Sequence, residues 1–248
     1  MTDYLPLPGT PIEELDTPCI VVDLDLAEAN IAKLQSAAKN MGVHVRPHSK
    51  TSKSPYWVRK QLDAGAIGIC CAKVGEAEVM VEAGITEVMI TSQVIGKSKI
   101  ARLLALAPSA QMIVAVEDSS NVLELSEASS AAGVEIGVIV ELNVGQDRCG
   151  TDPDGAVVLA RQVSEAPGLR FDGLMGYEGH LVAERDYETR KAETEKAMAI
   201  VTHTADLIRD AGISVPIVSA AGTGTYDITG RVKAVSYTHL TLPTNREV

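Results

Sequence analysis

The stretch "SSNVLELSEASSAAGVEIGVIVELNV" (119–144) contains the structural unit that decides the fold. Its first part carries helix-forming residues at helical spacing and ends at Gly133, the residue type that most easily takes the left-handed stop of a helix. Its second part, residues 136–144, is apolar at successive positions, as in a parallel strand that is covered on both faces. The stretch therefore predicts a helix that leads directly into a buried parallel strand.

The same unit recurs along the chain. Helical segments ending in "AGA", "AGI", "AAGV" and "DAGI" repeat the helix stop. The short apolar runs stand at 19–24, 43–47, 66–73, 87–92, 111–116, 136–144, 169–177 and 215–222. This alternation predicts an α/β fold with a parallel sheet. Because seven or eight units are present and no G-x-G-x-x-G follows the first run, a (β/α)8 TIM-type barrel is favoured over a doubly wound sheet.

The composition agrees with one large α/β domain and excludes several classes of partner. The chain has 248 residues, of which 46% are hydrophobic and only 3% aromatic, so aliphatic side chains must fill the core. The formal net charge of −11 disfavours nucleic acid and anionic membrane surfaces as partners. A local basic pocket for a small anionic ligand remains compatible with this charge.

The four cysteines predict a reducing compartment. Cys19, Cys70, Cys71 and Cys149 have no metal-ligand spacing, and we interpret them as buried thiols in preference to disulfides. The N-terminus has no leader pattern, and no apolar run is long enough to span a bilayer. We therefore expect a cytoplasmic protein.

In a barrel, catalytic groups lie where the strands end at their carboxyl side. Lys50 follows the run "VHVRPHS" (43–49), so it is such a candidate, with Lys53 nearby. A lysine there is either an ordinary solvated charge or a desolvated amine whose lowered pKa lets it form a Schiff base. The same rule also selects Lys73, Ser92, Gln93, Glu117 and Asp118.

Two further strand ends carry polar side chains. "NVGQDRCG" (143–150) places Arg148 in a loop bounded by glycines, as a ligand contact or as a surface charge. "GYEGH" (176–180) offers Tyr177 and His180, and His180 is either a site residue or a polar residue of the rim.

The turn "SAAGTGTY" (219–226) is a candidate phosphate site. Gly222, Thr223 and Gly224 would expose backbone N–H groups and a hydroxyl, which is what a phosphate monoester needs, although short glycine turns are common without a ligand. A strand-end lysine, an arginine and such a turn on one barrel face jointly indicate pyridoxal phosphate, since that cofactor needs an amine for its aldehyde and a cradle for its phosphate.

Five motifs in series resemble one known family. They are "RPHSKTSK" (46–53), "GICCAKVGEAE" (68–78), "NVGQDRCG" (143–150), "GLMGYEGH" (173–180) and "AAGTGT" (220–225). In this order they resemble the D-threonine aldolase and D-serine dehydratase-like group of fold-type III pyridoxal phosphate enzymes, which are related to alanine racemase. The resemblance covers roughly residues 15–230.

The resemblance implies roles for these residues. Lys50 would hold the cofactor and act in catalysis, with Lys53 as a supporting charge. Arg148 and Tyr177 would lie beside the cofactor, and residues 222–224 would surround its phosphate. The implied activity is a lyase that cleaves β-hydroxy-D-amino acids to glycine and an aldehyde; the alternatives are a dehydratase, an amino-acid racemase and a non-catalytic pyridoxal phosphate carrier.

The chain departs from the family pattern at several positions. Ser52 stands where a second histidine is expected, and alanines at 220 and 221 stand where glycines are usual. The family places a histidine six residues after the tyrosine, and that position is Ala183 here. His180 is therefore the candidate catalytic imidazole.

The end of the sequence resembles something else. "VSYTHLTLPT" (235–244) resembles a translated sequencing-library adapter, so we expect residues 1–234 to form the barrel and 235–248 to be a foreign tail. The barrel should then be incomplete at its last strand, with an open edge. The resemblance further implies that the full-length protein has a β-rich C-terminal domain, which holds a divalent metal, and that it forms a homodimer. We expect no metal ligands in this chain.

Overall fold

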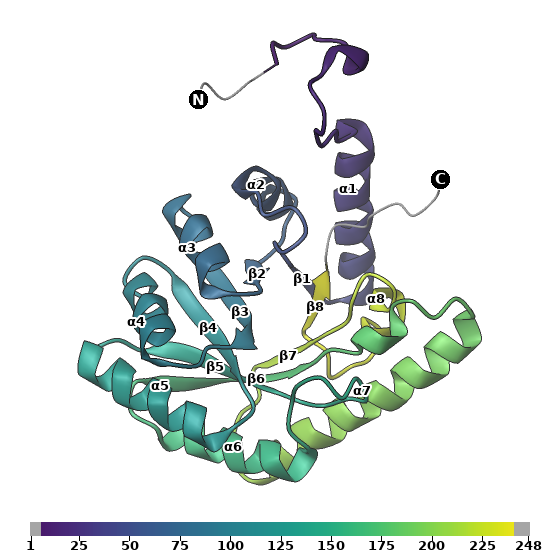
Figure 1. Cartoon of the computed structure of the whole chain (residues 1–248). Coiled ribbons are helices and arrows are strands. Elements are labelled where there is room, and N and C mark those ends of the chain that lie inside the picture. Colours follow the sequence, from purple (N-terminus) through teal and green to yellow (C-terminus); the bar gives the residue numbers. More distant parts are fainter. Residues whose placement is uncertain (1–5, 241–248) are drawn as a thin grey trace.

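A computed structural model describes residues 6–240, with side chains described for residues 6–236. Eight parallel strands form one sheet, and helices cover its outer face (Figure 1). The strands are β1 (His44–Pro47), β2 (Ile69–Cys71), β3 (Glu87–Gln93), β4 (Gln111–Val116), β5 (Ile136–Glu141), β6 (Leu169–Gly176), β7 (Ile217–Ala220) and β8 (Tyr237–Leu240).

Eight α-helices and two short 3-10 turns connect the strands of this part of the chain. They are η1 (Ile12–Glu14), α1 (Leu24–Met41), α2 (Pro55–Asp63), α3 (Val74–Glu82), α4 (Lys97–Leu106), α5 (Ser119–Ala132), α6 (Pro153–Glu165), η2 (Gly179–Leu181), α7 (Tyr187–Asp210) and α8 (Tyr226–Thr229). Gly42 and Gly133 end α1 and α5 in the left-handed conformation, at φ 74° and 66°. The predicted helix stops are therefore confirmed there.

The sheet curls into a barrel, which confirms the predicted fold class. Its strand order is β1-β8-β7-β6-β5-β4-β3-β2, and an isolated parallel bridge between His48 and Cys70 joins the two ends. Inside the sheet lies a cluster of buried residues that includes Met89, Ile139 and Met175. A larger cluster lies between the strands and the helices, so the interior is a packed core, as in other barrels of this type.

All four cysteines lie within the described residues, and they are not all buried, contrary to the prediction. Burial raises the pKa of Cys70 and of Cys71 to about 12, so both remain protonated and unreactive. Cys149 is half-buried, and Cys19 is exposed. Cys19 lies before α1, in a stretch whose residues 16–24 are all exposed.

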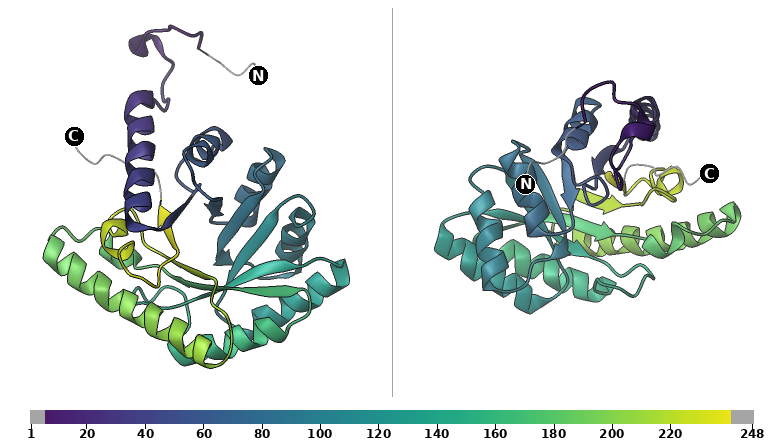
Figure 2. Two further views of the ribbon diagram at one scale, coloured as in Figure 1. Left: turned by 180° about the vertical axis from the view of Figure 1, so that it is seen from behind. Right: turned by 45° about the horizontal axis from the view of Figure 1, so that its top comes forward.

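The apolar run at 19–24 does not form the predicted strand. Residues 19–23 have no regular structure, and α1 begins at Leu24, where the Asp23 side chain accepts a hydrogen bond from the Leu26 N–H group. Ile20 is 94% exposed. The segment projects away from the barrel (Figure 2). A strand needs a neighbour, and β1 already has β8 on one side and β2 on the other.

The sequence predicts an open edge beyond residue 234, and the structure differs there. Tyr237–Leu240 forms β8, which pairs in parallel with β1 from His44 to Pro47 and with β7 at Ser219 and Ala220. Strand pairing uses backbone groups, so β-prone residues of any origin can occupy an edge that is available. Residues 241–248, including Pro243, lie outside the described residues.

None of the helices within residues 6–240 combines the length and the apolar character that a bilayer-spanning segment needs.

Candidate active site

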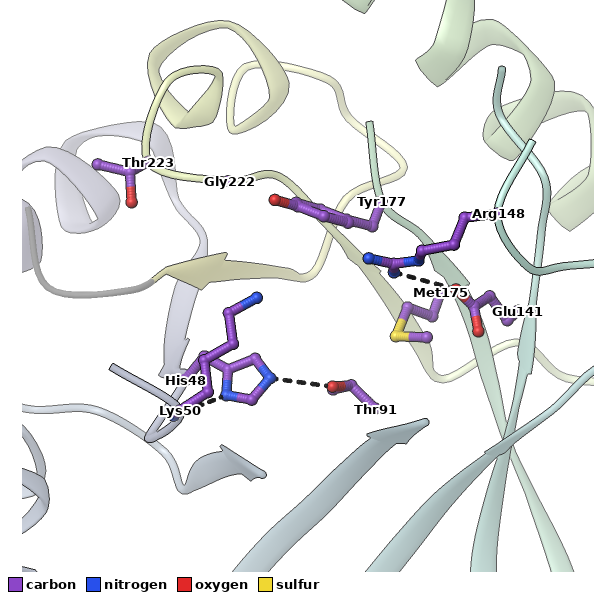
Figure 3. A pocket seen from close by; sticks show the side chains of 9 residues that line it. All are labelled: His48, Lys50, Thr91, Glu141, Arg148, Met175, Tyr177, Gly222 and Thr223. Atoms are coloured by element: carbon purple, nitrogen blue, oxygen red, sulfur yellow. Dashed lines mark hydrogen bonds and ion pairs between the residues drawn. The ribbon is translucent and has the colours of Figure 1, made fainter. Parts of the chain in front are cut away.

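One cavity opens among the strand ends that the sequence selected. The residues that line it are His48, Lys50, Thr91, Glu141, Arg148, Met175, Tyr177, Gly222 and Thr223 (Figure 3). Five strands (β1, β3, β5, β6 and β7) and the loops that follow them therefore contribute to a single site.

Lys50 reaches this cavity from the turn that follows β1. Its Nζ atom lies 5.8 Å from the centroid of the Tyr177 ring. Partial burial and, second, the positive charge of Arg148 lower the pKa of Lys50 below its ordinary value. A lowered pKa increases the fraction of neutral amine, which is the nucleophilic form. Lys53 does not line the cavity, and its backbone adopts the left-handed region at φ 47°.

Arg148 approaches the same ring from another loop. Its guanidinium carbon lies 5.6 Å from the Tyr177 centroid, and Nη2 lies 3.9 Å from Oε1 of Glu141. Glu141 is only 4% exposed and accepts a hydrogen bond of 2.6 Å from the Gln93 amide. Burial raises the pKa of Glu141, whereas the Gln93 and Arg148 interactions oppose that rise. Figure 3 shows Lys50, Tyr177 and Arg148 facing one another.

A buried carboxylate holds the glycine turn (residues 221–224) in place. Glu178, which is fully buried, accepts hydrogen bonds from the Ala221 N–H group at 3.1 Å and from the Thr229 hydroxyl at 2.6 Å. These contacts hold Ala221 at φ 76°, a conformation that residues with a side chain rarely adopt. In the sequence, Glu178 stands in the stretch 176–180 at a strand end, and no pattern there indicates that it shapes the turn.

The two glycines of the turn have different surroundings. A Cβ atom at Gly222 would lie 3.0 Å from the Tyr177 ring, so glycine keeps this side of the cavity open. A Cβ atom at Gly224 would lie 2.5 Å from the backbone oxygen of Val182. Gly224 does not line the cavity, and loop packing alone accounts for the glycine there. Its predicted contact with a phosphate stays a prediction.

His180 is not brought into the cavity. It lies in η2, is exposed, and its ring packs against Gly145, where a Cβ atom would be 3.3 Å from Nε2. The chain turns outward after Tyr177 and Glu178, which directs the imidazole to the rim. A catalytic role for His180 stays a prediction.

Four cavity residues were not selected from the sequence: His48, Thr91, Glu141 and Met175. Glu141 ends the run at 136–141, and Thr91 immediately precedes the selected Ser92, so the strand-end rule comes within one residue of both. His48 stood inside a quoted motif. Met175 resembles any core methionine in the sequence, and nothing there marks it.

A group of potential metal ligands lies beside the cavity. One ligand atom from each of Glu117, Glu141 and Cys149 falls within 4.8 Å of the others. Each carboxylate already has a partner, because Glu117 accepts a hydrogen bond from the Gly150 N–H group and Glu141 accepts one from Gln93. Burial raises the pKa of the Cys149 thiol, which disfavours the thiolate that binds metals. The contacts of Glu117, Glu141 and Cys149 therefore do not favour the binding of a metal ion.

The cavity residues fit a small aromatic aldehyde that bears a phosphate. Lys50 supplies an amine, Arg148 supplies a fixed cation, and the turn at Gly222 and Thr223 supplies a hydroxyl beside a side-chain-free wall. All of them face one space. This is the set of groups from which pyridoxal phosphate was inferred.

Residues 22–235 match the model of the family described as alanine racemase, N-terminal domain. The chain belongs to this family. The family consists of pyridoxal phosphate-dependent enzymes, so the resemblance inferred from the five motifs is confirmed.

Several proteins that resemble this chain in sequence or structure are aldolases. A D-threonine aldolase of Arthrobacter sp is 40% identical over 218 residues, which are 88% of this chain and 58% of that protein. A 3-hydroxy-D-aspartate aldolase of Paracoccus denitrificans (strain Pd 1222) is 38% identical over 227 residues, 90% of this chain and 59% of that protein. The crystal structure of a D-threonine aldolase from Filomicrobium marinum superposes with a TM-score of 0.90 at 42% identity, covering 91% of this chain and 62% of that one. This family member thus spans about three fifths of the length of these relatives.

Arg148→Met should shift the reactivity of Lys50 to higher pH. The substitution removes a positive charge that lowers the pKa of Lys50, so that pKa rises and less neutral amine is present at any fixed pH below it. For a partly exposed pair, a charge term on the order of 0.5–1 kcal/mol predicts a roughly two- to fivefold slower reaction. The measurement is the rate of labelling of Lys50 by pyridoxal phosphate and borohydride against pH. Arg185→Met, at an exposed position outside the cavity, is the control; identical pH profiles for all three proteins would contradict the expectation.

Proposed function

We propose that this chain is the cofactor-binding barrel of a pyridoxal phosphate-dependent lyase that cleaves β-hydroxy-D-amino acids to glycine and an aldehyde. The observation that carries the proposal is the single cavity in which Lys50, Arg148 and the Gly222–Thr223 turn meet. The similarity to aldolases for D-threonine and 3-hydroxy-D-aspartate supports the substrate class.

The cavity residues divide the work of binding. Lys50 provides the amine for the cofactor aldehyde, and the same amine, when protonated, can donate the proton that Cα gains once its bond to Cβ has broken. The hydroxyl of Thr223 and the turn around Gly222 lie where a phosphate would bind. The Tyr177 ring, with Lys50 and Arg148 on it at 5.8 and 5.6 Å, forms a wall between the two cations. When bound, pyridoxal phosphate supplies the electron sink for the bond cleavage.

A retro-aldol cleavage also needs a group that takes the proton of the β-hydroxyl. His180 is outside the cavity, and His48 inside it is a poor base because burial and the charge of Lys50 lower its pKa to about 3. No other described histidine lines the cavity. We propose that a divalent metal ion, held by residues outside this chain in a longer protein, would supply what this step needs by making the β-hydroxyl more acidic.

The assay for the function compares products. Purified protein with pyridoxal phosphate is incubated with D-threonine, D-allothreonine or 3-hydroxy-D-aspartate, with and without Mn²⁺, and L-threonine serves as the stereochemical control. The assay uses this chain and the longest reading frame of the source gene that contains it. We expect equimolar glycine and aldehyde from the D-substrates.

The alternatives give different products in the same assay. A dehydratase yields a 2-oxo acid and ammonia, and a racemase yields the substrate's mirror-image form at Cα without cleavage. A non-catalytic carrier binds pyridoxal phosphate and leaves every substrate intact. Any of these results, obtained with the longest reading frame, would replace the aldolase proposal.

A further inference from the structure

The strand that presents Lys50 is held unequally on its two sides. On one side β1 pairs with β8 over the residues from His44 to Pro47. On the other side β1 meets β2 through the isolated His48–Cys70 bridge instead of a regular ladder. The Ser49 N–H group donates to the Cys70 carbonyl at 2.8 Å, close to the point where the chain leaves the sheet for Lys50.

The His48 side chain adds a second link at this point. Its Nδ1 atom accepts a hydrogen bond of 3.2 Å from the backbone N–H group of Lys50. Its Nε2 atom lies 3.2 Å from the hydroxyl of Thr91 on β3, and that hydroxyl lies 3.4 Å from the Cys71 carbonyl on β2, to which it donates. The His48 ring thus connects the backbone of Lys50 to Thr91 on β3 (Figure 3).

The direction of these hydrogen bonds determines the tautomer. Because the Lys50 N–H group donates to Nδ1, that nitrogen carries no proton, and the proton of the neutral ring is on Nε2. Nε2–H then donates to Thr91, whose own proton goes to the Cys71 carbonyl. Burial, and then the charge of Lys50, lower the pKa of His48 to about 3, so the ring stays neutral near pH 7.

We propose that His48 is a positioning residue for Lys50: its neutral ring fixes the lysine backbone to Thr91 and β2 and so sets where the amine enters the cavity. This inference rests on the proposed attachment of cofactor to Lys50. Its first measurement needs no cofactor, so it stays separate from the outcome of the lyase assay.

The first measurement is ¹⁵N NMR of the histidine rings in the cofactor-free chain. We expect His48 to show the Nε2–H tautomer and no titration between about pH 5 and 8, the range in which an ordinary histidine changes its charge. An Nδ1–H tautomer, or titration of His48 in that range, overturns the proposal whatever the variants do.

The second measurement separates the two ends of the ring. His48→Asn keeps an acceptor near the position of Nδ1, whereas His48→Gln places its amide near the position of Nε2 and loses the contact with the Lys50 N–H group. The readout is the rate at which pyridoxal phosphate and borohydride label Lys50, followed by peptide mapping. We expect His48→Gln to slow labelling roughly threefold or more, and His48→Asn to retain most of the rate. Thr91→Val should give an intermediate effect.

His203→Gln on α7 is the matched control, and labelling of Lys53 in every variant reports on general reactivity. Equal labelling of Lys50 in the wild type and in a folded His48→Gln variant overturns the proposal, even if that variant melts at a lower temperature. Such a result would assign His48 a role in stability alone. If the His48→Gln variant does not fold, the tautomer of His48 and the labelling rate of Lys50 in Thr91→Val decide the question. An Nδ1–H tautomer, or an unchanged rate in Thr91→Val, then overturns the proposal.

Discussion

Lys50→Ala is expected to abolish covalent capture of pyridoxal phosphate, with at least about a 100-fold loss of borohydride-stable label on the chain. Lys50 is the lysine that lines the cavity among the described residues, and its pKa is lowered by partial burial and by Arg148. Removing the amine leaves the turn and Arg148 in place, so reversible binding of the cofactor should persist more weakly. Absorbance spectra and peptide mapping after reduction measure both effects.

Lys53→Ala and Lys73→Ala are the matched controls for this substitution. Lys53 lies in the same motif as Lys50, Lys73 lies in the next motif, and both are outside the cavity lining, so each variant should keep label at position 50. If the wild-type chain carries its label on Lys53 or Lys73 instead of Lys50, or if Lys50→Ala keeps its full label, the cofactor attaches elsewhere.

Removal of residues 237–248 is expected to make the chain aggregate. This deletion takes away β8, which pairs with β1 and with β7, so two parallel strands lose a partner at once. Exposed edges beside an apolar interior favour association between chains. The loss of stability should reach several kcal/mol, comparable with the roughly 5–15 kcal/mol that stabilises a whole domain. β1 also carries Lys50, so labelling of that lysine should fall with it.

Two controls show whether the pairing itself is responsible. A deletion of residues 241–248 keeps β8 and should remain monodisperse with a cooperative melting transition. Thr238→Pro removes a backbone donor from the middle of β8 and should reproduce much of the larger deletion, whereas Thr238→Val should not. Size-exclusion chromatography and thermal melting followed by circular dichroism measure these outcomes. A monodisperse, cooperatively folded chain ending at residue 236 would contradict the expectation.

The pairing of β8 bears on the origin of residues 235–248. We propose, from the resemblance of this stretch to an adapter sequence, that it is foreign to the family and occupies the position of the barrel's natural last strand. Sequencing the source gene across residue 235 tests this directly. A natural continuation there that codes for the same residues would refute it.

Much of the site was predictable because parallel strands impose a simple rule. The ends of such strands meet at one face, so Lys50, Arg148, Tyr177 and the turn at 222–223 come together once the strands are recognised. The same rule does not say which way a side chain turns after its strand ends. His180 and Tyr177 are three residues apart, and only Tyr177 lines the cavity.

By itself, the sequence determined the helices, their glycine stops and the buried strands, since these depend on each segment's own periodicity and on residues such as Gly133. Only the tertiary structure decided the rest. The runs at 19–24 and 237–240 are both β-prone, yet only the second became a strand, because it reached the edge between β1 and β7. His48 became the link to Lys50 because the fold placed Thr91 of β3 against its ring. Pairing and side-chain contacts depend on partners distant in the sequence, which local patterns do not encode.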